Sequence, residues 1–417
     1  MEEVVKDDIP VFQEPADKSR DNLMQLCRDL ADVFKTRAAK YDAEGSFPVE
    51  NFNDLKSAGL LGMMVPKEYG GWGLNFLSYS KALEILATGD ASTSLAFNMH
   101  NITVGSLAEI PAPPSDDRRS AKINAFREWV FKEAAEGKKL FASAASEPGI
   151  GAHFSKLKSN YTKTDDGFIL NGTKSFVSMA GYADYYVVAA KAAHSKSDQP
   201  AVSFLIVDRD APGSRMQNMW NVLGMRATST NPIHFEDCFV PKDRLYMASE
   251  GMALYKIARE PHWLAGGYSG VYLGIMTATF DFLVDFLKKK KLPGTETPLS
   301  DDPVVQHQMG KLYTLITSAR LAVYHAANLV DTQRGSDEAN AAIHHAKYLV
   351  SEGGPQLAAE AIRMCGASSI SKHLPLERFY RDSRCGALQP AYSDDCLSYL
   401  GKASFGANLK NPIETYW

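Results

Sequence analysis

An acidic residue, a proline and two glycines are concentrated in the stretch ASEPGIGAH at 145–153. Pro148 fixes φ and lacks an N–H group, while Gly149 and Gly151 allow backbone conformations that other residues avoid. Such a backbone can come very close to a ligand and point free N–H groups at the ligand's acceptors. Surface turns use the same residue types. This stretch alone therefore leaves a ligand-binding turn and a surface turn both open.

Composition and charge limit the kind of protein that carries this turn. The 417 residues are 45% hydrophobic, enough to bury the cores of two or three domains. Forty-five basic and 49 acidic residues give a net charge of −4 without a strongly one-signed block, which argues against nucleic acid or a membrane surface as the main partner. Five scattered cysteines without a CxxC pair indicate a reducing compartment and argue against a structural metal site.

The N-terminal sequence and the length of the apolar stretches bear on where the protein is located. The start, MEEVVKDDIP, is acidic and has no apolar segment of the signal-peptide kind. From the sequence we predict that no stretch reaches the roughly 20 apolar residues of a membrane span. We therefore expect a cytoplasmic protein without a membrane-spanning segment.

The hydrophobic pattern changes twice along the chain. Apolar residues at helical spacing predict a helical domain over 1–139, with one mainly helical stretch running from Phe76 to Gly105. Short β-like runs, including a hairpin with its turn at Asn171-Gly172, predict a small β domain over 140–250. Long amphipathic stretches then predict a helical bundle over 251–417.

Five segments, in this order, resemble the acyl-CoA dehydrogenase superfamily over nearly the whole chain. They are GLLGMMVPKEYGGWG (59–73), ASEPGIGAH (145–153), LNGTKSFVSMAGYADYYVV (170–188), GMRATSTNPIHFEDCFVP (224–241) and LPLERFYRDSR (374–384). The resemblance implies an α+β multidomain fold with an all-α N-terminal domain, a central β-barrel-like domain and a C-terminal four-helix bundle. It also implies one FAD per subunit, an acyl-CoA thioester substrate, an electron-accepting flavoprotein and a homo-oligomer, usually a tetramer.

The resemblance gives the turn at 145–153 a role beside the flavin. Ala145 and Ser146 would face the pyrimidine side of the ring, where donors help because charge gathers there on reduction. Gly151 and Ala152 would lie near the pyrophosphate and the substrate thioester, although the family usually has a serine where this chain has Ala152.

Further cofactor residues follow from the same resemblance. Phe176 and Ser178 match an aromatic ring beside the isoalloxazine and a hydroxyl near N5, whereas strand alternation alone would make Phe176 an ordinary inward residue. Arg226, followed by Thr228, Ser229 and Thr230, matches a region that shapes the barrel and the approach to the cofactor. Gly366 and Ala367 match a segment that approaches the dinucleotide of the neighbouring subunit, where the family usually has two glycines.

The expected catalytic base is missing from its usual place. An acyl-CoA dehydrogenase removes the α-proton with a carboxylate while the β-hydrogen leaves as hydride to flavin N5. In most of the family that glutamate follows the Arg-Asp pair, but here its position falls on Pro390, and the neighbouring Tyr392 also departs from the pattern.

A minority of the family takes the base from an opposite helix, shortly before a small-residue run. That run is AGGYSG (265–270) here, and counting back gives Glu260 as the candidate base. Pro261 disfavours α conformation at Glu260, so a solvated glutamate at a kinked helix start remains the alternative. Asp394 and Asp395 are further candidates.

A second departure keeps other functions open. The family's Arg-x-x-Phe-Gly segment after the first bundle helix is replaced by a segment that looks more like the flavin monooxygenases built on this fold. Those enzymes need no α-proton base, and His100 is a candidate for the histidine they often place near the flavin, although a lone helical histidine is often structural. The hypotheses are therefore an acyl-CoA dehydrogenase with a displaced base, a flavin-dependent monooxygenase acting on an aromatic or sulfur compound, and a catalytically silent flavin or acyl-CoA binding protein.

Overall fold

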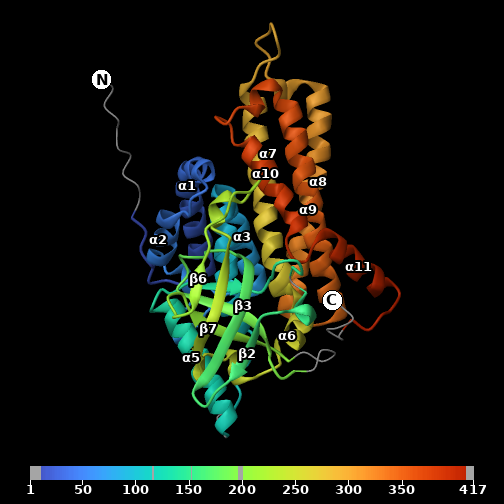
Figure 1. Cartoon of the computed structure of the whole chain (residues 1–417). Helices are drawn as coiled ribbons and strands as arrows, with labels where there is room; N and C mark the ends of the chain where they lie inside the picture. Colours follow the sequence, from blue (N-terminus) through green and yellow to red (C-terminus); the bar gives the residue numbers. More distant parts are fainter. Residues whose placement is uncertain (1–10, 115–116, 152, 196–200, 410–417) are drawn as a thin grey trace, which may run out of the picture.

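The computed structural model describes residues 11–114, 117–151, 153–195 and 201–409, so Ala152 lies outside the described residues. The chain forms a helical N-terminal part, then a curled sheet, then a long helical C-terminal part (Figure 1). This order confirms the predicted α+β fold class. The sheet occupies one end of the molecule and the long C-terminal helices extend away from it (Figure 1).

The described residues of the N-terminal part form five α-helices. They are α1 (Arg20–Glu44), α2 (Val49–Ser57), α3 (Phe76–Gly89), α4 (Ala91–Ala108) and α5 (Arg118–Ala135). The stretch predicted as one helical segment is divided at Asp90, whose carboxylate accepts hydrogen bonds from the first turn of α4 at Ser92 and Thr93. Helix α4 is buried on nearly every side, because it lies between the sheet, α3 and α7.

The central part is a seven-stranded sheet. Its strands are β1 (Phe141–Ala144), β2 (Asn160–Lys163), β3 (Gly167–Val177), β4 (Tyr185–Ala192), β5 (Val202–Asp208), β6 (Ser214–Met216) and β7 (Asn231–Pro241). The order is β1-β4-β2-β3-β7-β6, and β5 pairs with β4 on its other edge. Strands β1 and β2 both pair with β4 in parallel, whereas β3 pairs with β2 and β7 in antiparallel.

The predicted hairpin at Asn171-Gly172 is wrong. Strand β3 runs through both residues without a turn, and its pairing with β7 shifts register between Leu170 and Gly172. Gly172 has φ 143°, and a Cβ there would lie 2.3 Å from the Ser159 hydroxyl oxygen. The Asn171 side chain is used sideways, since its oxygen accepts from the Asp237 amide at 2.8 Å. The dipeptide thus marks a bulge with close backbone packing.

The C-terminal part is helical. Its helices are α6 (Ala253–Arg259), a π-helical turn (His262–Gly266), α7 (Gly267–Lys289), α8 (Pro303–Gln333), α9 (Asp337–Cys365), α10 (Leu376–Arg384) and α11 (Ser393–Ser404). Helices α7, α8, α9 and the shorter α10 pack together as the predicted bundle (Figure 1). The glycine-lined face of α7 lies against α3: a Cβ at Gly270 would be 2.8 Å from the Ser80 carbonyl oxygen, and one at Gly274 would be 2.4 Å from that of Glu84.

One apolar segment corrects a prediction made from the sequence. The described stretch His262–Lys289 is long and apolar enough, by composition, to cross a membrane, and 61% of its most apolar window is buried inside the protein. Its apolar faces are used in packing against α3, α8 and α9.

Candidate active site

A cavity of about 440 Å³ opens where the three parts of the chain meet. We divide its lining by chain segment into a sheet-side wall and a helix-side wall. The sheet-side wall contains Ala145, Ser146, Phe176, Ser178 and Thr230, and the helix-side wall contains Tyr246, Lys256, Glu260, Gln389, Pro390 and Tyr392. Among the described residues that line the cavity, Lys256 and Glu260 are the two with charged side chains.

The predicted site residues fall into two groups. Those that line the cavity are Ala145, Ser146, Phe176, Ser178, Glu260, Pro390 and Tyr392. Those that do not line it are His100, Gly151, Arg226, Gly366 and Ala367. The structure therefore brings together residues from the β domain and from two separate C-terminal segments.

A buried ion pair fixes the turn at 145–151. Lys174 Nζ lies 2.7 Å from Glu147 Oε1 and donates to the Ala145 carbonyl at 3.2 Å, and both charged side chains are almost fully buried. Burial opposes ionisation of Glu147, but the Lys174 ammonium and the amides of Lys158 and Ser159 hold the pKa of this carboxyl below its usual range. The turn is thus held from inside the sheet, which leaves Ala145 and Ser146 facing the cavity.

Gly151 allows the turn to approach the C-terminal loop. It has φ 59°, and a Cβ at this position would lie 3.1 Å from the Tyr392 hydroxyl oxygen. A larger residue would strain the backbone and press on Tyr392. Gly151 therefore contributes close packing between the two walls.

Phe176 does not follow strand alternation. Its φ is 55°, it lies at a register shift of β3, and its side chain is 66% exposed although Lys174, two residues earlier, is fully buried. The interpretation of Phe176 as an ordinary inward residue is therefore wrong: the bulge turns the ring into the cavity. Ser178 begins a chain of hydroxyls, with its oxygen 2.9 Å from that of Thr230, which lies 2.6 Å from that of Thr228.

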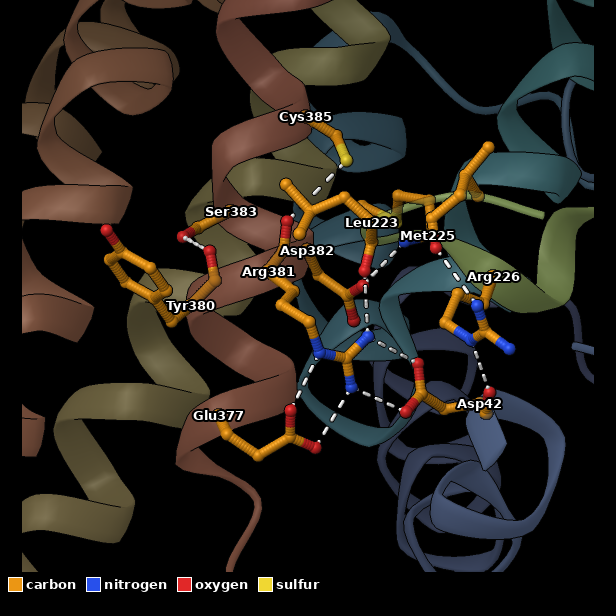
Figure 2. Close-up of polar contacts among 11 residues, drawn as sticks. Asp42, Leu223, Met225, Arg226, Glu377, Tyr380, Arg381, Asp382, Ser383 and Cys385 are labelled. Carbon is orange, nitrogen blue, oxygen red and sulfur yellow. Dashed lines mark hydrogen bonds and ion pairs between the residues drawn. The ribbon is translucent and has the colours of Figure 1, made fainter. Parts of the chain in front are cut away.

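Arg226 supports the cavity from outside. Its guanidinium donates to the Asp42 carbonyl at 2.8 Å and to the Val222 carbonyl at 3.0 Å (Figure 2). This joins the end of α1 to the loop 220–224, which lines the cavity. Arg226 thus has the structural role in shaping the approach, and its side chain is not among the lining groups.

The Arg-Asp pair of α10 holds the same loop, a role that the sequence did not suggest. Arg381 donates to both oxygens of Asp42, at 2.9 and 2.6 Å, and to the Leu223 carbonyl at 3.0 Å (Figure 2). Asp382 accepts from the Met225 amide at 2.6 Å. Burial raises the pKa of Asp382 to about 7. All three parts of the chain are joined at this point.

His100 is a core residue of α4. Its Nε2 lies 2.9 Å from the Leu61 carbonyl oxygen, and its Nδ1 accepts from the Phe141 amide at 3.2 Å. Burial lowers its pKa to about 4, so the ring is neutral at physiological pH. With both ring nitrogens engaged and the side chain turned from the cavity, the structure does not bring His100 to the flavin side.

Gly366 and Ala367 lie at the C-terminal end of α9, away from the cavity. Gly366 has φ 75° and an open surface around its Cα, since a Cβ would meet nothing within 4 Å. Their expected role concerns a neighbouring subunit and stays a prediction.

The loop 386–391, where the resemblance predicts the usual catalytic glutamate, is held by a buried lysine. Lys347 Nζ, fully buried in α9, donates to the carbonyls of Gly386 at 2.7 Å, Gln389 at 3.2 Å and Ala391 at 3.0 Å. Burial lowers the pKa of Lys347 to about 8. The loop is therefore firmly positioned, with Pro390 presented to the cavity.

The other carboxylate candidates in this region differ in position. Asp394 and Asp395 begin α11, where Asp395 accepts from the Tyr392 amide at 3.3 Å, and neither lines the cavity. Glu260 does. It ends α6 with φ −127° and ψ 53°, as the following proline requires, and its carboxylate pairs with Lys256 Nζ at 2.5 Å.

The sheet-side wall suits a planar, hydrogen-bonding ring such as a flavin. The exposed Phe176 ring in a strained backbone conformation offers an aromatic surface, and Ser146 and Ser178 offer polar groups beside it. A metal site has no comparable support, since the described residues contain no group of three or more His, Cys, Asp or Glu side chains that could hold a metal ion.

Comparisons with known proteins agree with this architecture. The chain matches the N-terminal, middle and C-terminal domain models of acyl-CoA dehydrogenases over residues 18–110, 142–238 and 265–388. It is 31% identical over 365 residues to the mitochondrial short-chain specific acyl-CoA dehydrogenase of Homo sapiens, which covers 87% of this chain and 84% of that protein. It is also 31% identical over 409 residues to L-evernosamine nitrososynthase of a Micromonospora strain, covering 93% and 91%.

A solved structure shows the same fold. FMN-bound TdsC from Paenibacillus sp. A11-2 matches with a TM-score of 0.82 at 19% identity, covering 95% of this chain and 100% of that one. The family matches support a flavin cofactor. With three domain models in the family's order and relatives aligned over most of both chains, this chain belongs to the acyl-CoA dehydrogenase family.

Proposed function

We propose that this chain is a flavin-dependent acyl-CoA dehydrogenase in which Glu260 removes the α-proton of the bound thioester. The supporting observation is that Glu260 is the carboxylate among the described cavity-lining residues, while the loop at the usual position of the base presents Pro390. It lines the same cavity as Ser146, Phe176 and Ser178, which suit the flavin ring. Substrate would then lie between the base and the flavin.

The residues of each wall have distinct tasks in this proposal. Bound flavin supplies the two-electron acceptor that no amino-acid side chain provides. The backbone at Ala145 and Ser146 and the hydroxyl of Ser178 hold its ring, and Phe176 packs beside it. Glu260 takes one proton, and the apolar lining excludes water so that the carboxylate meets the substrate in a desolvated site.

The state of Glu260 sets a condition on this chemistry. One oxygen of the Glu260 carboxylate, Oε2, is held by the Lys256 ammonium at 2.5 Å. For the carboxylate to be free to reach the α-proton, Lys256 must be drawn away from Glu260, or share its donors with another group, when the substrate binds.

The proposed cofactor is FAD, held with the help of Gly366 and Ala367 from a neighbouring subunit in a homo-oligomer. An electron-accepting flavoprotein would reoxidise it, and the expected location is the cytoplasm. Because the family's Arg-x-x-Phe-Gly segment is replaced in this chain, FMN is the alternative cofactor to FAD. Chromatography of the flavin released from purified protein identifies which one is bound.

The function is tested by anaerobic titration of the flavin-loaded protein with short, medium, long and branched acyl-CoAs while the oxidised-flavin absorbance is recorded. We expect bleaching with one class of thioester. In Glu260→Gln we expect retained flavin and a bleaching rate reduced on the order of 10²–10⁴-fold. Asp394→Asn is the matched control, because this exposed carboxylate lies outside the cavity. Unchanged bleaching in Glu260→Gln removes Glu260 from the mechanism.

A flavin-dependent monooxygenase is the second candidate. It is favoured by Pro390, by the pairing of Glu260 with Lys256, and by similarity to a nitrososynthase over nearly the whole chain. An absence of bleaching by every acyl-CoA, together with oxygen-dependent product formation once reduced flavin is supplied, supports this candidate. Stable flavin binding with neither reaction supports the catalytically silent binding protein.

A further inference from the structure

The ion pair Lys256–Glu260 is the charged feature of an otherwise neutral cavity. Its side chains are largely buried, with 18% and 10% of their surfaces exposed, and both line the cavity wall. Placing two charges in such surroundings costs several kcal/mol in desolvation, and hydrophobic residues of similar volume would often be as stable or more so. Fold stability alone therefore gives little reason for this pair.

Lys256 has hydrogen-bonding capacity beyond Glu260. Its ammonium carries three donors, of which one meets Glu260 at 2.5 Å and one is shared with the Tyr246 hydroxyl, so a third remains for a ligand. The Tyr246 hydroxyl is itself engaged with Ser106 at 2.8 Å. Burial alone would lower the pKa of Lys256, but Tyr246 and Glu260 raise it above its usual value, so the ammonium stays charged at neutral pH.

The rest of the helix-side wall cannot neutralise a charged ligand. Gln389 already accepts from Tyr272 at 2.7 Å, and Pro390 and Tyr392 carry no charge. Arg226 and Arg381 are committed to Asp42 and to loop carbonyls outside the cavity. An anionic group that enters the cavity therefore meets Lys256 as its one cationic partner among the described lining residues.

We propose that Lys256 binds an anionic group at the far end of the substrate's acyl chain, so that the preferred thioesters carry a terminal carboxylate. This inference rests on the proposed acyl-CoA substrate. A ligand carboxylate that takes donors of Lys256 competes with Glu260 for them. The same contact that selects the substrate therefore frees Glu260 as a base, which satisfies the condition noted above.

The test measures binding directly, by isothermal titration calorimetry on the flavin-loaded full-length protein. The probes are two pairs of equal chain length, glutaryl-CoA against pentanoyl-CoA and adipoyl-CoA against hexanoyl-CoA. We expect at least one carboxylated thioester to bind about 10-fold or more tightly than its neutral partner, the ratio produced by one charge-assisted contact of about 1.4 kcal/mol.

Variants separate recognition from folding. Lys256→Met should bring the ratio of affinities for the carboxylated and the neutral thioester close to 1, and Lys256→Arg should keep most of this preference. Glu260→Gln should bind the carboxylated thioester more tightly than the original protein, because the competing carboxylate is gone. Lys163→Met is the matched control, since Lys163 forms a comparable pair with Glu250, at 2.6 Å, outside this cavity.

The outcomes distinguish this inference from the proposed function. Equal affinity within both pairs, or no binding of any probe, would overturn it. A selective affinity without any bleaching would support anion recognition and remove the dehydrogenase proposal. Bleaching by hexanoyl-CoA, together with equal affinities within both pairs, would support the dehydrogenase proposal and overturn the recognition of a terminal carboxylate by Lys256.

Discussion

The two walls of the cavity are each anchored by a fully buried lysine, but in different ways. On the sheet side, Lys174 is paired with Glu147, a carboxylate that also caps the amides of the neighbouring turn. On the helix side, Lys347 meets no carboxylate of the described residues within hydrogen-bonding distance and donates to three backbone carbonyls of the loop 386–391.

This difference bears on which parts of the site can change. The sheet-side wall follows the acyl-CoA dehydrogenase pattern, and its anchor depends on two specific side chains. In the alignment that the resemblance predicts, the helix-side wall departs from that pattern at Pro390. Its anchor does not depend on the loop's side chains, because every residue has a carbonyl. A loop held this way can lose its glutamate and keep its shape.

Breaking the sheet-side anchor should have the largest effect. Lys174→Met leaves Glu147 buried and unpaired, so we expect the free energy of unfolding to fall by about 3–5 kcal/mol and flavin to be lost. Urea unfolding and flavin absorbance measure the two effects. The double variant Lys174→Met/Glu147→Met should recover much of the stability, since no isolated charge remains. A single variant within about 1 kcal/mol of the original protein would contradict the role of the pair.

Breaking the helix-side anchor should destabilise less and leave flavin in place. Lys347→Met removes the donor from three carbonyls, of which that of Gln389 is only partly buried, so we expect a loss of about 2–4 kcal/mol. The readouts are urea unfolding, flavin content and thioester affinity, with the exposed Lys372→Met as control. Loss of flavin in Lys347→Met would show that the two walls do not act separately.

The junction in Figure 2 joins α10 to the loop that ends at Met225 through a titratable group. Burial raises the pKa of Asp382 to about 7, against an unfolded value near 3.8, although Arg378 and Arg381 act in the opposite direction. The folded protein therefore holds this proton more tightly than the unfolded chain does. The contribution of Asp382 to the free energy of unfolding must fall as pH rises from about 4 to about 7, by at most about 1.4 kcal/mol per pH unit.

Asp382→Asn isolates this effect, because the amide oxygen can still accept from Met225. Urea unfolding at several pH values should show a flatter dependence in Asp382→Asn than in the original protein over that interval. Parallel pH curves for the two proteins would mean that Asp382 is ionised in the folded state across this range.

The sequence was sufficient for features that depend on local pattern or family order. The succession of helices, strands and helices and the non-helical end at Glu260 were both expected, the first from residue spacing and the second from proline chemistry. Asn171-Gly172 misled because the same dipeptide serves a tight turn and a strand bulge, and pairing on both edges of β3 decides between them.

The anchors could not be predicted, for two separate reasons. Glu147 and Lys174 are 27 residues apart, and only the fold brings them together. The acceptors of Lys347 are carbonyls, which leave no trace in the sequence. The pair Lys256–Glu260 did leave one, because charges of opposite sign four residues apart meet on a helix, and that spacing was the available signal for a charged cavity wall.

We expect the smallest effect from removing a single side-chain hydrogen bond from the helix-side loop. The Tyr272 hydroxyl donates to Gln389 Oε1 at 2.7 Å, while its ring packs under Gly386, where a Cβ would be 3.1 Å from the ring. Tyr272→Phe keeps that packing, so we expect a loss of about 1 kcal/mol in the free energy of unfolding. Because Lys347 still holds the loop backbone, thioester affinity should change less than about twofold, or roughly 0.4 kcal/mol. A larger loss of affinity in Tyr272→Phe than in Lys347→Met would mean that side-chain contacts, and not the carbonyl anchor, set the shape of this wall.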